Sequence, residues 1–264
     1  MVNTFWFEAQ NISCYKNGFR VIKNLNLKIA CSENVVLIGP NGSGKSSLIQ
    51  LINRSIYPVV GNKSILKIFD KELINLWELR KRISTVNTDI KNRINPDLQV
   101  LDLILSGLYG GFCYIPNKSE RDIYKVKKIM KITDISNLSN KKFSHLSDGE
   151  KQISLIVRAL INKPDILILD EPITNLDYKS KFFVIDKIDE LSKLETKILC
   201  VTHDISMITR IYDRVIMLKN GEIIADGHQN NVINSENLKK LYGIKLEVNK
   251  INGIWTIKRL SNNN

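Results

Sequence analysis

Residues 39–46 read GPNGSGKS, which is the pattern G-x-x-x-x-G-K-S. Residues 35–38 before it are all apolar, as in a buried strand, and residues 46–52 after it are glycine-free and mostly apolar, as at the start of a helix. A glycine loop between a strand and a helix lets backbone N–H groups surround phosphate oxygens, and the helix dipole attracts the same charge. We therefore predict that this loop binds the phosphates of a nucleotide, with Lys45 reaching the β- and γ-phosphates and the Ser46 hydroxyl a candidate ligand of magnesium.

The composition is that of a folded globular chain. Its 264 residues are 43% hydrophobic and 25% charged, which suits one large α/β domain with a helical insert, or two small domains. Uninterrupted apolar runs of about 18 residues are missing, and the N-terminus has no basic region followed by an apolar stretch, so we expect neither a transmembrane helix nor a signal peptide. The net charge of +12 favours phosphate-bearing partners, either nucleic acid or an anionic membrane face.

Strands and helices alternate along much of the chain. Residues 4–29 alternate apolar and polar residues around the turn at residues 16–18, which predicts an antiparallel β element. Residues 97–161 have a helical pattern, and from residue 166 to residue 225 buried strands alternate with helices. This order predicts a mostly parallel sheet with helices on both faces. A last hairpin is expected around Asn252-Gly253. The four cysteines are scattered, and we expect unpaired thiols in a reducing cytosol.

Two acidic residues follow the buried strand predicted at residues 166–169. At the carboxyl edge of a parallel sheet, Asp170 and Glu171 face the ligand crevice. Asp170 can anchor magnesium, directly or through water, and Glu171 can orient and deprotonate a water molecule that attacks the γ-phosphate. The alternative is that both carboxylates only solvate the edge of the sheet.

The segment LSDGE at residues 146–150 predicts the start of a helix. Ser147 and Glu150 have the spacing of a capping box, in which each side chain satisfies a backbone N–H near the other. A capped helix start also offers N–H groups and a hydroxyl that can grip a γ-phosphate, which would belong to the nucleotide of a second subunit. His203 follows the strand predicted at residues 198–201, from where it can reach the γ-phosphate; the alternative is a purely structural histidine.

Taken together, these motifs resemble those of the nucleotide-binding subunits of ATP-binding cassette (ABC) transporters, over nearly the whole chain. Residues 39–47 match the Walker A motif, residues 166–171 match the Walker B motif, and residues 146–150 resemble the signature L-S-G-G-Q. Residues 174–177 fall where the family has its D-loop, and His203 falls at the switch histidine.

The resemblance implies a P-loop NTPase fold of ABC type, with a mostly parallel sheet, an antiparallel β element and a helical insert. It places an ABC ATPase domain at residues 1–245, with a helical subdomain at about 90–160, and a C-terminal β-hairpin and tail at residues 246–264. It also implies ATP and Mg²⁺ as cofactors and a head-to-tail homodimer, in which each ATP lies between one Walker A motif and the opposite signature.

The resemblance assigns roles residue by residue. Tyr15 falls where the family stacks an aromatic ring on adenine, although an ordinary strand aromatic is the alternative. The implied catalytic residues are Glu171 and His203, and the implied magnesium ligands are Ser46 and Asp170. The D-loop residue is Asp177, and the signature residues that contact the partner's ATP are Ser147, Asp148, Gly149 and Glu150. The implied ATP-binding residues are Tyr15, Gly39, Pro40, Asn41, Gly42, Ser43, Gly44, Lys45, Ser46, Ser47 and Asp170.

Three positions depart from the family pattern. Residues 86–89 lack the glutamine of the Q-loop, and Thr88 falls at the equivalent place. In the signature, Asp148 replaces glycine and Glu150 replaces glutamine. An added carboxylate near a γ-phosphate costs electrostatic energy unless it points away.

The function implied by the resemblance is ATP hydrolysis that drives a separate integral membrane permease, together with a substrate-binding protein. The chain would then be cytoplasmic and peripheral on the inner face of the membrane, with no specific nucleic acid. Residues 218–223 and 226–227 resemble the ATPases of metal-chelate importers and related solo ABC ATPases, and the first of these indicates metal or metal-chelate uptake. Two alternatives remain: a soluble ABC ATPase acting on nucleic acid or ribosomes, and a regulatory module that does not hydrolyse ATP. The apolar stretch at residues 98–115 is either a docking surface for the permease or the interior of the helical subdomain.

Overall fold

The computed structural model describes residues 4–59 and 63–259, apart from the side chain of Thr88. The chain divides into two compact units. The first consists of Met1–Arg80 together with Lys197–Asn264, and the second is Lys81–Thr196. The helical subdomain expected at about 90–160 lies inside the second unit, which also contains two strands.

The strands of the first unit form two larger sheets and a hairpin. An antiparallel sheet in the order β2-β1-β4 contains β1 (Phe5–Lys16), β2 (Phe19–Ala30) and β4 (Ile65–Ile68). In the other sheet β3 pairs in parallel with β7 and with β8, and β9 runs antiparallel to β8. These strands are β3 (Val35–Ile38), β7 (Lys197–Thr202), β8 (Arg214–Lys219) and β9 (Glu222–His228). The hairpin consists of β10 (Leu246–Ile251) and β11 (Ile254–Arg259).

Short helices join these strands. The helices that belong to the first unit or begin in it are α1 (Lys45–Ile52), α2 (Leu76–Arg82), η5 (Ile205–Met207), α7 (Gln229–Val232) and α8 (Ser235–Tyr242). The expected strand, loop and helix around residues 39–44 are present as β3, the loop and α1. All four residues of β3 are buried, as expected for a parallel strand covered on both faces.

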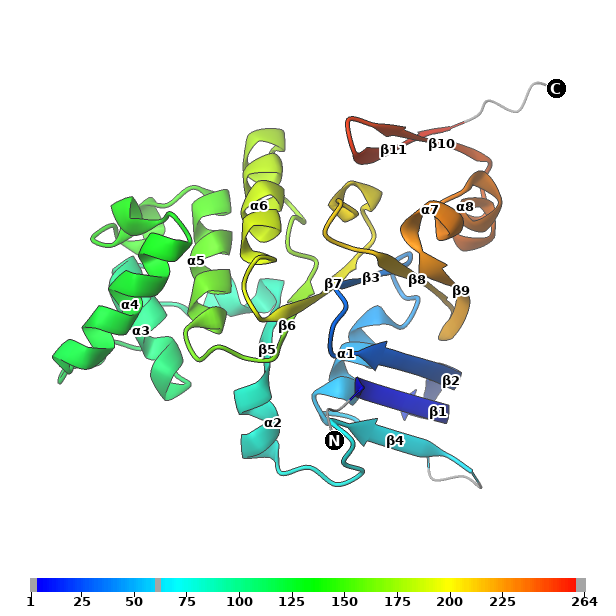
Figure 1. The fold of residues 1–264 in the computed structure, drawn as a ribbon, viewed down its shortest axis with the longest axis horizontal. Helices are drawn as coiled ribbons and strands as arrows, with labels where there is room; N and C mark the ends of the chain where they lie inside the picture. The colour runs from blue at the N-terminus through cyan, green and yellow to red at the C-terminus, as the bar shows by residue number, and fades with distance from the viewer. Residues whose placement is uncertain (1–3, 60–62, 260–264) are drawn as a thin grey trace. The chain divides into compact units, whose positions relative to one another are not determined.

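The second unit is mainly helical. Its two strands, β5 (Ile83–Val86) and β6 (Ile166–Asp170), pair in parallel with Val86 opposite Leu169. Figure 1 shows α3 to α6 in green to yellow. The helices of this unit are η1 (Thr88–Arg93), α3 (Val100–Ser106), η2 (Gly107–Tyr109), α4 (Glu120–Ile132), η3 (Ser136–Leu138), η4 (Phe143–His145), α5 (Asp148–Leu160) and α6 (Tyr178–Leu191).

The helix α3 forms the first part of the apolar stretch at residues 98–115. Leu103, Ile104 and Leu105 are fully buried, and α3 packs against α4 and α5. The α3 part of residues 98–115 therefore packs in the interior of the second unit, whereas Tyr109 and Tyr114, which follow it, are more than half exposed.

Asn-Gly pairs form three of the hairpin turns. Asn17-Gly18, Asn220-Gly221 and Asn252-Gly253 all have positive φ at both residues, as a type I′ turn requires. The turns expected at residues 16–18 and at Asn252-Gly253 are thus confirmed. Within residues 4–59 and 63–259, no helix combines the length and the apolar composition needed to cross a membrane.

Candidate functional site

The glycine loop in the first unit lies between β3 and α1. At two of its glycines, neighbouring atoms leave no room for a side chain. A Cβ atom on Gly39 would overlap the carbonyl oxygen of Leu218, and one on Gly44 would lie 2.8 Å from the carbonyl oxygen of Val21. Gly42 has no atom near its Cβ position, but its φ of 78° is a conformation that other residues rarely adopt. The two outer glycines therefore let neighbouring backbone approach the loop, and the middle one sets its curvature.

Backbone hydrogen bonds hold this loop from two sides. The Gly39 N–H donates to the Thr202 carbonyl at 3.3 Å, at the end of β7. The Gly221 N–H, in the turn between β8 and β9, donates to the Ser43 carbonyl at 2.8 Å, and the Gly221 carbonyl accepts from the Lys23 N–H at 2.9 Å. The loop is thus fixed by main-chain contacts that do not depend on side-chain identity.

The side chains of the loop separate into buried and exposed groups. Lys45 is 7% exposed, and its Nζ donates to the carbonyls of Gly39 (2.7 Å) and Pro40 (3.1 Å), so the ammonium lies back over the loop. Ser43 and Ser47 are buried, whereas Asn41, Gly42 and Ser46 are exposed. A ligand can therefore reach the tip of the loop and the Ser46 hydroxyl.

His203 and Tyr15 are the other two candidate site residues of the first unit. Each lies near a residue whose backbone carbonyl approaches the glycine loop. His203 is exposed and follows Thr202, which pairs with Ile38, so it lies at the same sheet edge as the loop. Tyr15 is 52% exposed and pairs with Arg20, the residue before the Val21 carbonyl that approaches Gly44. An exposed aromatic ring in this position can stack on a flat ligand.

In the second unit, the buried strand β6 carries Asp170 at its carboxyl end. Glu171 comes next with a φ of 52°, a strained conformation for a residue with a Cβ atom. The Thr174 hydroxyl donates to Glu171 Oε2 at 3.1 Å. The turn of the backbone and this hydrogen bond fix the direction of the Glu171 carboxylate.

The loop after β5 contains a residue that the sequence analysis missed. Asn87 follows Val86, which pairs with Leu169, so Asn87 lies at the same sheet edge as Asp170. Its side-chain oxygen is buried and has no hydrogen-bond partner within the described part of the chain. A buried amide oxygen beside a carboxylate is the kind of ligand that Mg²⁺ or its water binds. Thr88 begins η1, and its side chain lies outside the described atoms.

The capping box predicted at the start of α5 is present. Ser147 Oγ accepts from the Glu150 N–H at 3.2 Å, and Glu150 Oε2 accepts from the Ser147 N–H at 2.8 Å. Glu150 also pairs with Lys141 at 3.1 Å. Burial acts to raise the pKa of Glu150, but the Ser147 N–H and the Lys141 ammonium outweigh it, so this pKa lies below its ordinary value of 4.5. The Glu150 charge is thus neutralised locally, while the exposed Asp148 forms an ion pair of 3.4 Å with Lys151.

Gly149 and Asp177 connect this helix start to α6. A Cβ atom on Gly149 would lie 3.2 Å from both Phe183 Cδ1 and Ser180 Cβ, so a side chain there would crowd α6. Asp177 caps α6 by accepting from the Ser180 N–H at 2.8 Å, and this hydrogen bond lowers the pKa of its carboxyl group. Ser147, Glu150 and Asp177 line one surface pocket of about 570 Å³. The second unit thus brings the signature and D-loop candidates together.

The comparison with known families matches a part of the chain that contains both the glycine loop and the start of α5. The family profile described as ABC transporter matches residues 22–174. The chain belongs to the ABC transporter family. It is an ATP-binding subunit of that family, whose members hydrolyse ATP, and the expected P-loop fold of ABC type is confirmed.

Relatives of this ABC ATPase cover nearly the whole chain. The uncharacterized ABC transporter ATP-binding protein YmeB of Lactococcus lactis is 30% identical, over 91% of this chain and 93% of its own length. The zinc import ATP-binding protein ZnuC of Psychrobacter cryohalolentis is 32% identical over 88% and 87%. The phosphonates import ATP-binding protein PhnC 2 of Oceanobacillus iheyensis is 30% identical over 90% and 96%.

Solved structures have the same fold as the ABC ATPase described here. One is an inward-facing conformation of a putative metal-chelate type ABC transporter, with a TM-score of 0.78, 20% identity and 98% coverage of both chains. Another is cbiO1 from Clostridium perfringens, part of the ABC transporter complex cbiONQ, with a TM-score of 0.76, 26% identity, and coverage of 90% of this chain and 94% of that one.

Proposed function

We propose that this ABC ATPase powers a separate membrane permease that takes up a metal ion or metal chelate, by closing as a homodimer on ATP and opening after hydrolysis. The observation that carries the proposal is the glycine loop at residues 39–44, which is braced by backbone bonds and leaves its tip open to a ligand. A rigid ring of N–H groups stabilises phosphate charge without reorganising.

In the first unit, four side chains have proposed roles. Lys45 pairs with the β- and γ-phosphates, exchanging its contacts with the loop carbonyls for phosphate oxygens. Ser46 offers a hydroxyl ligand for Mg²⁺, and the exposed Tyr15 stacks on adenine. His203, at the same sheet edge as the loop, donates a hydrogen bond to the γ-phosphate.

In the second unit, the residues with proposed roles lie at the carboxyl end of β6 and at the N-termini of α5 and α6. Glu171 is the general base for the attacking water, because its carboxylate is fixed by the backbone and by Thr174. Ser147 and the N–H groups at the start of α5 contact the γ-phosphate of the partner subunit's ATP, and Asp177 orders the adjoining loop.

The donor set at the edge of β5 and β6 fits Mg²⁺. Asp170 provides a carboxylate, and the Asn87 amide oxygen is a buried acceptor without a partner among the described residues. Mg²⁺ binds such hard oxygen ligands and retains several waters. When bound, Mg²⁺ would neutralise phosphate charge; in this unit Asp170 would hold it, with Asn87 holding the ion or one of its waters.

Support for a transported metal comes from the zinc import relative and from the metal-chelate type structure. The test reconstitutes the chain with its cognate permease in proteoliposomes and measures ATP hydrolysis together with uptake of radioactive Zn²⁺. A phosphonate serves as the competing substrate, because a phosphonate importer ATPase is almost as similar to this chain.

We expect Zn²⁺ or a metal chelate to be accumulated only in the presence of ATP. Uptake of the phosphonate alone would contradict the metal assignment and leave the transport assignment in place. Hydrolysis that is indifferent to the permease, together with salt-sensitive binding to RNA, would overturn the transport assignment in favour of the nucleic-acid alternative.

A further inference from the structure

The loop after β7, which carries His203, is restrained by hydrogen bonds on both sides of this histidine. The Asp204 N–H donates to the Thr202 hydroxyl at 3.0 Å, and Asp204 Oδ1 accepts from the N–H and the hydroxyl of Ser206, at 2.9 and 2.7 Å. On the other side, the Thr202 carbonyl accepts from the Gly39 N–H. The direction of the exposed imidazole therefore depends on how the backbone of His203 itself is held.

The main chain of His203 has a partner on a distant helix. The Tyr242 hydroxyl donates to the His203 carbonyl at 3.0 Å, across 39 positions of the chain. Tyr242 is half-buried and is the last residue of α8. This hydrogen bond engages the backbone of His203 and not its imidazole. It can therefore orient the histidine without competing with a ligand for the ring.

The end of α8 is itself a fixed point. Leu238 and Leu241 are buried, and α8 packs against β8, β9 and β10. Gly243 ends the helix with a φ of 77°, and its N–H donates to the Lys239 carbonyl at 2.8 Å. The Tyr242 hydroxyl is thus held by a helix end that both packing and a C-terminal cap stabilise.

The same turn of α8 also contacts the hairpin that holds the glycine loop. The Lys219 ammonium donates to the Lys240 carbonyl, two residues before Tyr242. Lys219 is the last residue of β8, and the turn that follows it contains Gly221, whose N–H donates to the Ser43 carbonyl. One helix end therefore forms hydrogen bonds both to the loop that carries the histidine and to the hairpin that holds the glycine loop.

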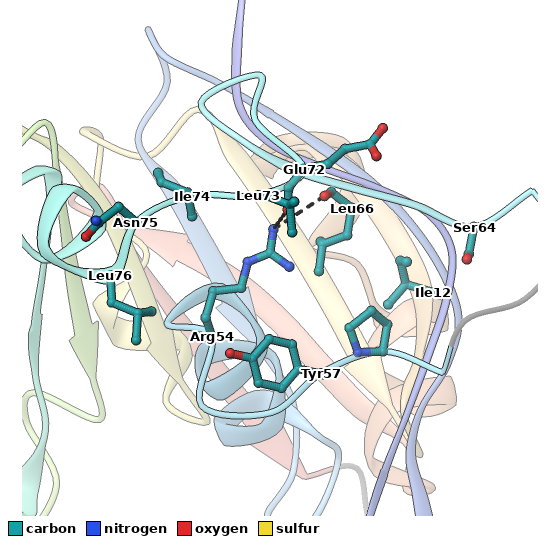
Figure 2. Close-up of a pocket in the computed structure, with 11 residues that line it drawn as sticks. Ile12, Arg54, Tyr57, Ser64, Leu66, Glu72, Leu73, Ile74, Asn75 and Leu76 are labelled. Carbon is teal, nitrogen blue, oxygen red and sulfur yellow. Dashed lines mark hydrogen bonds between the residues drawn. The ribbon is translucent and has the colours of Figure 1, made fainter.

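Hydrogen bonds from a side chain to backbone carbonyls also fix another part of the first unit. Figure 2 shows the Arg54 guanidinium donating to the carbonyls of Leu66 and Glu72, at 3.4 and 2.9 Å. That contact joins the chain after α1 to β4 and the segment behind it, and neither acceptor is a candidate site residue. The Tyr242 contact is of the same kind, but its acceptor is the residue expected to reach the γ-phosphate.

We propose that Tyr242 is a positioning residue for ATP hydrolysis, whose hydroxyl holds the backbone of His203 so that the imidazole meets the γ-phosphate. The inference rests on the role proposed above for His203 and adds the residue that orients it. Without the hydroxyl, the His203 backbone would move, and less of the bound ATP would be in the reactive geometry. ATP binding should change little, because the glycine loop keeps its own backbone hydrogen bonds.

The test compares ATP hydrolysis by the full-length chain with that of Tyr242→Phe, which removes only the hydroxyl. The matched control is Tyr109→Phe in the second unit, where the lost hydroxyl donates to the Asp122 carboxylate at 2.9 Å. We expect kcat of Tyr242→Phe to fall roughly three- to tenfold, the effect of one net hydrogen bond, with KM for ATP unchanged. Tyr109→Phe should keep both constants.

A double-mutant cycle shows whether the hydroxyl acts through His203. His203→Ala should lower kcat more than Tyr242→Phe does. Adding Tyr242→Phe to His203→Ala should then change the residual rate by less than about twofold, because the histidine that the hydroxyl orients is already absent. If Tyr242→Phe lowered kcat equally with and without His203, the hydroxyl would act elsewhere and the proposal would be wrong.

The imidazole offers a second measurement, because the chain contains only three histidines. The signal that disappears in His203→Ala identifies His203 in the NMR spectrum of the full-length chain. A non-hydrolysable ATP analogue with Mg²⁺ should shift this signal in the unchanged chain and in Tyr109→Phe, and should shift it less in Tyr242→Phe. Equal shifts in all three proteins would contradict the positioning role.

Two outcomes separate this proposal from the proposed function. If Tyr242→Phe hydrolyses ATP as fast as the unchanged chain while His203→Ala is strongly impaired, the positioning role alone is overturned. If His203→Ala itself hydrolyses ATP at the full rate, the role proposed for His203 fails and the positioning role fails with it. Uptake by the reconstituted permease tests the transport function independently of both results.

Discussion

At the scale of single residues, the phosphate loop depends on one buried ammonium. Replacing Lys45 by Ala removes the group that lies over the Gly39 and Pro40 carbonyls. A hydrogen bond to a charged group contributes about 1.5–3 kcal/mol, so we expect ATP affinity to fall about 10- to 100-fold and hydrolysis to be lost. Calorimetric titration with ATP and a phosphate-release assay measure both. Lys258→Ala, at an exposed position of β11, is the matched control and should change neither.

Asn87 offers a second test at this scale. Its buried side-chain oxygen lacks a partner in the described chain, so Asn87→Ala should leave the melting temperature unchanged or raise it. If the amide holds Mg²⁺ or one of its waters, the same change should lower hydrolysis by about tenfold and raise the Mg²⁺ concentration that gives half-maximal activity. Asn249→Ala, at an exposed position of β10, is the control. A variant that is destabilised but fully active would show that Asn87 is only structural.

At the scale of elements, Glu150 at the start of α5 both completes the capping box and forms an ion pair with Lys141. The pKa of Glu150 is lowered in the folded chain, so its ionised form adds stability above the ordinary value of 4.5, and this stability is lost as the pH falls through the lowered pKa. At pH 7 the variant Glu150→Gln should therefore be less stable by about 0.5 kcal/mol, since Gln keeps the cap but loses the pair with Lys141. Below the lowered pKa the two proteins should unfold at the same urea concentration.

Urea unfolding at a series of pH values makes this measurement, with Glu236→Gln as the comparison. Glu236 also has a lowered pKa through Lys240, but it belongs to an exposed pair within α8. If Glu236→Gln lost more stability at pH 7 than Glu150→Gln, the result would contradict the importance of the capped helix start.

Elements with a local pattern could be predicted from the sequence. The glycine loop, the capping box and the Asn-Gly turns each need only neighbouring residues, and all of them are present. Asn87 could not be predicted in this way. It matters through its register with Asp170 on another strand, and that register depends on tertiary packing.

At the scale of the whole molecule, the proposed mechanism requires two copies of the chain. Glu171→Gln should slow hydrolysis by roughly 10²- to 10⁴-fold, as expected for loss of a general base, while ATP still binds. The trapped state should elute with the mass of a dimer in light-scattering chromatography with ATP. Combining it with Ser147→Ala should return a monomer, whereas combining it with Ser119→Ala, at the similar N-cap of α4, should not. A monomer for Glu171→Gln alone would contradict the dimer, and rapid hydrolysis would contradict the role of Glu171.

The tip of the β8–β9 hairpin has a consequence for how this protein can vary. The Gly221 N–H donates to the Ser43 carbonyl, and the Gly221 carbonyl accepts from the Lys23 N–H. The glycine loop is therefore held in place by a hairpin turn that is more than 170 positions away in the chain. Most surface substitutions nearby should be silent, because main-chain atoms make these links. A one-residue insertion or deletion at the tip, by contrast, would break the Gly221 hydrogen bonds to Ser43 and Lys23. The length of this hairpin is therefore under tighter constraint than its side chains.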